Sequence, residues 1–149
     1  MSKINYVLAG LGGAAALNLL HESLKHKADD MPRVDLVGEE VIQKSLNYFG
    51  CPVNDEAALY RITLAADLVS NALYYSLIAV GSKKYIWARA IAYGLAGGIG
   101  AVALPKPLGL NPEPVTKSSK TKGLTIAYYL AGALVTGAIL KAITNKQQQ

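Results

Sequence analysis

Long apolar stretches and polar connections alternate along this chain of 149 residues. Four stretches stand out, at roughly residues 4–21, 57–81, 85–104 and 123–143. Each is about as long as the ~20 apolar residues that a helix needs to cross the hydrocarbon core of a bilayer. Backbone amides in hydrocarbon must find hydrogen-bond partners within their own segment, so these stretches are expected to be helices. The pattern predicts an all-α integral membrane protein, with four transmembrane helices in one domain over residues 1–149.

A fifth helix is predicted in the connection between the first two stretches, which is too polar to cross a membrane. Its apolar positions recur at intervals of three to four residues: Val37, Val41, Ile42, Leu46 and Phe49. Positions between them are polar, and Asp35 can cap the first turn. This spacing predicts an amphipathic helix over residues 35–49 that lies in the headgroup region or over the end of the helix bundle.

Small residues are concentrated in three of the four apolar stretches. Gly94 and Gly98 form a GxxxG pair in the third stretch. The others include Gly10, Gly12 and Gly13 in the first stretch and Gly132 and Gly137 in the fourth. Faces of this kind let two helices approach closely, and in lipid such packing replaces the missing hydrophobic driving force. We therefore expect a tight, glycine-rich four-helix bundle, formed either within one chain or between copies of it.

Charged residues make up 17% of the chain, below the roughly 25% of soluble domains, because the apolar stretches contain so few. The formal net charge is +5. Basic residues that flank apolar spans contact lipid phosphates and set membrane orientation, so we expect a lipid bilayer and not nucleic acid as a partner. The two long connections carry eight Lys and Arg residues, against five on the opposite side. This excess favours a cytoplasmic location for the long connections. We expect the membrane to be a bacterial inner membrane.

The most polar surface inside the predicted spans lies in the second stretch. Its residues Thr63, Asp67, Asn71 and Tyr74 follow a helical spacing that places them on one face. Asn18 of the first stretch lies at nearly the same depth as Asp67, because both are fourteen residues from the side of the termini. We therefore predict an intramembrane polar site formed by Asn18, Asp67, Asn71 and Tyr74.

Two interpretations of this site are open. In the first, Asp67 binds a proton or a cation, because an ionised group in hydrocarbon costs at least ~2.5 kcal/mol unless it has a partner. In the second, Asp67 is protonated or hydrogen-bonded and simply holds helices together. The second interpretation is physically adequate, because desolvation favours the neutral carboxyl, which costs far less to bury.

A further polar group is predicted where the first apolar stretch ends. Glu22 emerges there at the level of Arg61, which lies one turn into the second stretch, so we expect an ion pair between them. His21 and His26 suggest a zinc-binding helix, but they are five residues apart and that motif needs a spacing of four. We expect solvated residues at the helix end and no metal site.

Motifs for catalysis are missing from the sequence, which has no GxSxG, no cysteine matched to a histidine and no glycine-rich phosphate loop. We therefore expect no catalytic residue and no cofactor. The first hypothesis is a non-catalytic structural or accessory subunit of a membrane complex, or a homo-oligomer, whose partners are other membrane subunits or copies of the chain. The alternative is a small proton- or cation-coupled transporter or channel around Asp67, for which several copies would have to assemble. A membrane enzyme is a third hypothesis.

Overall fold

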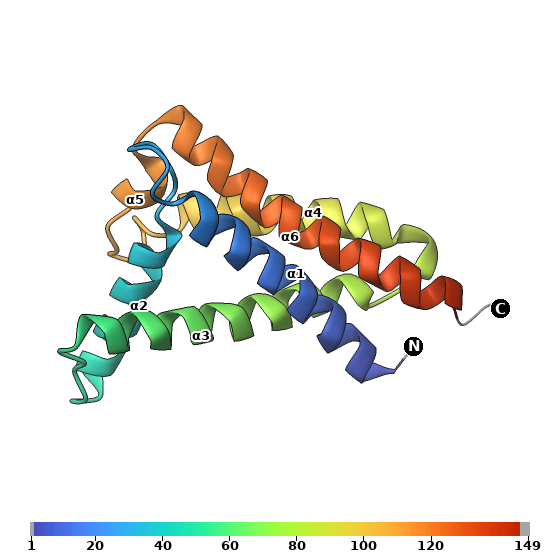
Figure 1. Ribbon diagram of the computed structural model, residues 1–149, viewed down its shortest axis with the longest axis horizontal. Helices are drawn as coiled ribbons and strands as arrows, with labels where there is room; N and C mark the ends of the chain where they lie inside the picture. The colour runs from blue at the N-terminus through green and yellow to red at the C-terminus, as the bar shows by residue number, and fades with distance from the viewer. Residues whose placement is uncertain (1, 147–149) are drawn as a thin grey trace.

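Four long helices, α1, α3, α4 and α6, form the body of the molecule (Figure 1). The structure is a computed structural model that describes residues 2–146, and this part of the chain is helical without any strand. The helices are α1 (Lys3–Leu24), α2 (Val34–Tyr48), α3 (Glu56–Ser76), α4 (Ile86–Ala103), α5 (Glu113–Thr116) and α6 (Ser119–Lys146). Two 3₁₀ turns, η1 (Leu77–Ala79) and η2 (Lys83–Tyr85), join α3 to α4.

The helical class agrees with the sequence prediction. Four segments are long and apolar enough to cross a membrane: Lys3–Leu24, Glu56–Ala79, Lys83–Ala103 and Ser119–Lys146. They coincide with the four predicted stretches and extend them by a few residues at most ends. The last segment is the longest at 28 residues, because α6 begins at Ser119, about one turn before the predicted apolar stretch.

The long helices pack in the order α4, α6, α1, α3, so α6 and α1 are the central pair. Figure 1 shows that they converge at the end where both termini and the η1–η2 turn lie, and diverge toward the opposite end. At the divergent end α3 stands apart from α4 and α6, and α2 crosses the space between them. The body of the molecule is therefore a wedge whose wide end is closed by α2.

Several glycines lie where two helices approach each other. A Cβ atom on Gly98 would lie 2.6 Å from the Cα of Ile126, and one on Gly94 would lie 2.8 Å from the Cα of Leu130. Both distances are shorter than Cβ atoms tolerate, so a larger residue at either position would push α4 away from α6. Gly10 lies in the same way against the backbone of α3, and Gly13 against α6.

The amphipathic helix α2 begins one residue before the predicted start and lies across the wide end of the wedge. It rests on α3 at Gly38, where an added Cβ would lie 2.8 Å from Cγ2 of Thr63. Asp35 does not cap this helix, contrary to the prediction. The cap position is occupied by Arg33, and the Asp35 carboxylate in the first turn is drawn instead to basic side chains.

Candidate functional site

Three of the four residues predicted for the intramembrane polar site meet in the structure. Asn71 Nδ2 donates a hydrogen bond of 2.9 Å to Oδ1 of Asp67, one turn away on α3. The side chain of Asn18, on α1, also hydrogen-bonds to Asp67. None of the ion pairs found between residues 2 and 146 involves Asp67. Its carboxyl group is therefore held by two amides and has no counter-ion in this part of the chain.

Tyr74 lies on the same face of α3 but does not bond to Asp67. Its hydroxyl donates a 2.8 Å hydrogen bond to the backbone carbonyl of Tyr93 on α4. This bond ties α3 to α4 on the convergent side of the wedge. Helix spacing alone places Tyr74 in line with Asp67, but the position of α4 decides where its hydroxyl finds an acceptor.

A small cavity, which we call the polar cavity, lies between α1, α2, α3 and α6 and has a volume of about 40 Å³. Asn18 and Asp67 line its inner part, and His21, Glu22 and Asp35 line its outer part. Its volume exceeds the ~10–15 Å³ that a water molecule needs. Two buried polar atoms of lining residues, Nε2 of His21 and Oγ1 of Thr63, have no hydrogen-bond partner in the structure. The cavity thus offers polar partners for a small polar occupant.

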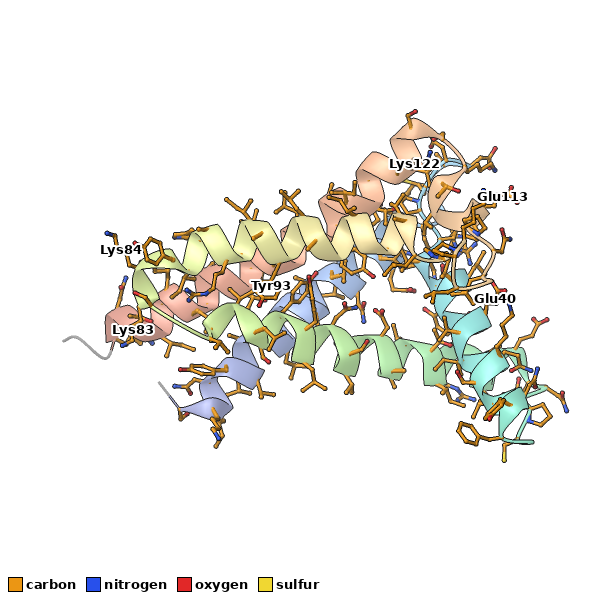
Figure 2. All side chains as sticks on the ribbon, turned by 180° about the vertical axis from the view of Figure 1, so that it is seen from behind. Glu40, Lys83, Lys84, Tyr93, Glu113 and Lys122 are labelled. Atoms are coloured by element: carbon orange, nitrogen blue, oxygen red, sulfur yellow. The ribbon has the colours of Figure 1, made fainter. Side chains whose placement is uncertain are left out.

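A larger opening, the apolar groove, lies between α2, α3, α4 and the segment that follows α4, with a volume of about 400 Å³. Figure 2 shows α3 and α4 running apart toward the end where α2 crosses them, which is where this groove lies. The lining residues are Val34, Val37, Gly38, Val41, Asp67, Tyr74, Ala96, Gly97, Gly100, Ala101, Leu104, Pro105, Leu108, Leu110 and Tyr129. Asp67 lines the polar cavity as well, and with Val34, Gly38 and Tyr129 it is one of the residues that line both spaces.

Five charged or hydroxyl side chains form an ion-pair cluster at the outer side of the polar cavity. Lys25 Nζ lies 2.9 Å from Glu22 and 3.3 Å from Asp35, and it donates a 3.2 Å hydrogen bond to the hydroxyl of Tyr60. That hydroxyl in turn donates to the carboxylate of Glu22. Arg33 makes two hydrogen bonds of 2.9 Å to Asp35, one to each carboxylate oxygen. The cluster joins the end of α1 to the first turn of α2 and the first turn of α3.

Electrostatics in the ion-pair cluster favour the charged forms of its members. Burial by itself raises the pKa of the Asp35 carboxyl, but the hydrogen bonds from Arg33 and the nearby positive charges outweigh it and hold this pKa below its usual value. Burial likewise opposes the charge on Lys25, but its hydrogen bonds to Glu22 and Tyr60 raise the pKa of the ammonium above its usual value. Both groups are therefore ionised near neutral pH.

The predicted ion pair between Glu22 and Arg61 is absent from the described part of the chain. Glu22 binds Lys25 and Tyr60 instead, while Nε of the exposed Arg61 donates to the carbonyl of Ala57. Successive helix residues point about 100° apart because a turn holds 3.6 residues, so α3 cannot turn both Tyr60 and Arg61 toward α1.

His21 is buried and not solvated at a helix end as predicted. It is 7% exposed, with Nδ1 3.4 Å from Glu22 and Nε2 3.5 Å from Asp35. Its ring meets that of Tyr128 edge-on. Between residues 2 and 146 no group of three or more His, Cys, Asp or Glu side chains is placed to hold a metal ion.

The sequence pattern did not identify four partners in this cluster: Lys25, Arg33, Asp35 and Tyr60. The spacing of Glu22 and Lys25, three residues apart on one helix, is a local signal that could have identified the first pair. The meeting of Lys25 with Asp35 depends on how α2 folds back over α1, and nothing in the local pattern carries that information.

Comparison of the chain with protein-family models, curated proteins and solved structures found no match.

Proposed function

We propose that this chain is an integral membrane protein in which α1, α3, α4 and α6 cross the bilayer and α2 lies at one membrane surface. The length and apolar character of the four helices support this placement. Large aliphatic side chains are also exposed on all four: Ile4, Leu8, Leu19, Val69, Leu73, Ile91, Leu95, Ile99 and Val135. Soluble monomers rarely expose so much contiguous apolar surface, whereas lipid tails solvate it. The close glycine contacts support a tight bundle within one chain.

Within that frame, we propose that the chain is a small proton- or cation-coupled carrier or channel, with Asp67 as the ion-binding group. One observation carries the proposal: among the residues that line both the polar cavity and the apolar groove, Asp67 is the one with an ionisable carboxyl group. A carboxyl group that lines both spaces can exchange protons or cations with each of them. A carboxylate at this depth without a counter-ion is unstable, so it must take up a proton or a cation.

The polar cavity supports the proposal because it connects Asp67 with the surface. Its outer part is lined by His21 and by Glu22, whose side chain is 31% exposed. Thr63 and Asn18 provide further polar atoms along the way. Protons can therefore reach Asp67 through a path of polar side chains, while lipid tails exclude water from the outside of the bundle.

Infrared spectroscopy of the purified protein tests whether Asp67 binds protons. We expect the band of a protonated carboxyl group to change as the pH moves between about 4 and about 9, a range over which model carboxyl groups and histidines titrate. The difference between the wild-type and Asp67→Asn spectra isolates Asp67, because the signals of the other carboxyl groups cancel, and it should contain a carboxyl band that changes with pH. The band should also appear when Asp67→Asn is compared with Asp55→Asn, which alters an exposed capping carboxylate at the start of α3. A difference spectrum between the wild type and Asp67→Asn without any pH-dependent carboxyl band would contradict the proposal.

A second candidate function is a structural or accessory subunit that assembles with partner subunits or with copies of itself. It is favoured by the face of α4 that lines the groove, where Ala96 is exposed and Gly100 and Ala101 are half-buried. A Cβ on Gly100 would meet only Leu104 of the same helix, at 3.5 Å. Native mass spectrometry after mild extraction separates the two: a complex that Gly100→Leu dissociates supports assembly through this face, and a monomer without partners contradicts it.

A further inference from the structure

We propose that the apolar groove binds a lipophilic organic cation, whose charged centre lies against the Asp67 carboxylate and whose apolar body lies against α2, α4 and residues 104–110. This inference rests on the proposed function, since it takes Asp67 as the ion-binding group, and it names the class of cation.

The carboxylate of Asp67 has hydrogen-bond acceptor positions that remain unfilled. Its carboxylate accepts hydrogen bonds from two amides, those of Asn18 and Asn71. A carboxylate offers about four acceptor positions, so two remain free. No lysine or arginine lines the groove. The nearby Lys44 on α2 is engaged with Glu40 at 2.8 Å and with the carbonyl of Gly109 at 2.6 Å. A positive charge in the groove would therefore have to come from the ligand.

The residues that line the groove indicate which kind of cation can bind there. Metal ions of the calcium or magnesium type bind six or more oxygen ligands. Here Asp67 provides a carboxylate, and the only other polar side-chain groups of the lining are two hydroxyls, that of Tyr129 and that of Tyr74, which is committed to Tyr93. Twelve of the fifteen lining residues are glycine, proline or aliphatic. Such a lining excludes a hydrated inorganic ion and matches a cation with an apolar body.

The volume of the groove and its aromatic residues also fit an organic cation. The volume of about 400 Å³ lies within the ~300–1,000 Å³ of ligand pockets in proteins. Tyr74 and Tyr129 line the groove together with Asp67. Aromatic faces attract organic cations, and more strongly where water is excluded. An anionic amphiphile such as a fatty acid would meet the charge of Asp67 at close range and is disfavoured.

Equilibrium dialysis of the full-length protein in detergent micelles, with tetraphenylphosphonium as the probe, tests the inference. We expect saturable binding that weakens as the pH falls, because protons compete for the carboxylate. Asp67→Asn should weaken binding by about tenfold or more, since it removes the opposite charge. Tetraphenylborate, an anion of the same shape, should show no saturable binding.

Two glycine variants separate the groove from general effects on the fold. Gly100→Leu places an isobutyl group in the groove and should also weaken tetraphenylphosphonium binding. Gly123→Leu is the matched control, because a Cβ at that position of α6 meets nothing within 4 Å, and it should bind like the wild type.

Three results would overturn the inference: no saturable tetraphenylphosphonium binding, equal binding of tetraphenylborate, or unchanged affinity in both Asp67→Asn and Gly100→Leu. Failure of this inference can be distinguished from failure of the proposed function. If infrared spectroscopy shows that Asp67 titrates while tetraphenylphosphonium does not bind, the proton site stands and the organic cation is wrong. If Asp67 does not titrate, the proposed function itself fails.

Discussion

Arg89 shows how a single residue can determine the local structure of the convergent end. Its Nε donates a 2.7 Å hydrogen bond to the carbonyl of Ile78, and Nη1 donates a 2.9 Å bond to that of Ser82. Both carbonyls follow α3, and that of Ser82 also accepts a 3.1 Å hydrogen bond from the backbone amide of Tyr85. Gly81 lies between them with a φ of +111°, a conformation that favours glycine. Arg89 thus fixes the turn that joins α3 to α4.

We predict that Arg89→Lys destabilises the protein by about 1–3 kcal/mol, because an ammonium group cannot hold both carbonyls in the fixed geometry of a guanidinium. Thermal unfolding in detergent measures the effect. Arg61→Lys is the control and should change little, since Arg61 is exposed and its Nε bonds to a carbonyl of its own helix. Equal stability of Arg89→Lys and the wild type would show that the two bonds do not hold the turn.

At the scale of elements, α2 is the part of the molecule whose position depends most on charge. The helix buries none of its residues, so packing alone holds it weakly. Asp35 attaches its first turn to Lys25 and Arg33. In the middle of α2, Glu40 accepts a 2.8 Å hydrogen bond from the backbone amide of Asn111. These polar contacts hold α2 over both the polar cavity and the apolar groove.

The lowered pKa of Asp35 predicts how the stability of this attachment depends on pH. A carboxyl group whose pKa is lower in the folded protein than in the unfolded chain stabilises the fold above the unfolded value of about 3.9. This stabilisation is lost as the pH falls through the folded value. The unfolding temperature of the wild type in detergent should therefore decrease below about pH 4 more steeply than that of Asp35→Asn. Parallel curves for the two proteins would contradict the role given to Asp35.

Some contacts of the candidate site can be predicted from the sequence, and others cannot. The meeting of Asp67 with Asn71 follows from helix spacing, and the meeting with Asn18 follows from matching depths in two antiparallel helices. The contacts of Tyr74 with Tyr93 and of Glu22 with Tyr60 could not be predicted in this way. Each depends on which face of a helix turns toward its neighbour, and that is decided by packing of the whole bundle.

At the scale of the whole molecule, the four apolar helices follow from length and composition, but their order in space does not. Four apolar stretches can pack in several ways with similar burial. The structure selects α4–α6–α1–α3, in which glycines of α1 and α4 lie against neighbouring backbone. The wedge and its groove are consequences of this order, because α3 and α4, which are joined by a short turn, are not packed against each other along their length.

Four membrane crossings are the central claim, because both proposals place Asp67 in a part of the molecule surrounded by lipid tails. The native Cys51 is exposed between α2 and α3, at the wide end of the wedge. Ser82 is exposed in the turn at the opposite end, on the side of the termini. Four crossings put these two positions on opposite sides of the membrane.

Labelling with a membrane-impermeant maleimide, in sealed vesicles of uniform orientation, tests this arrangement most directly. The wild type reports on Cys51, and Ser82→Cys in a Cys51→Ser background reports on the turn. We predict that one of these proteins is labelled in intact vesicles and that the other is labelled only after the vesicles are permeabilised. Labelling of both proteins in intact vesicles, or of neither, would place both positions on one side and contradict the account.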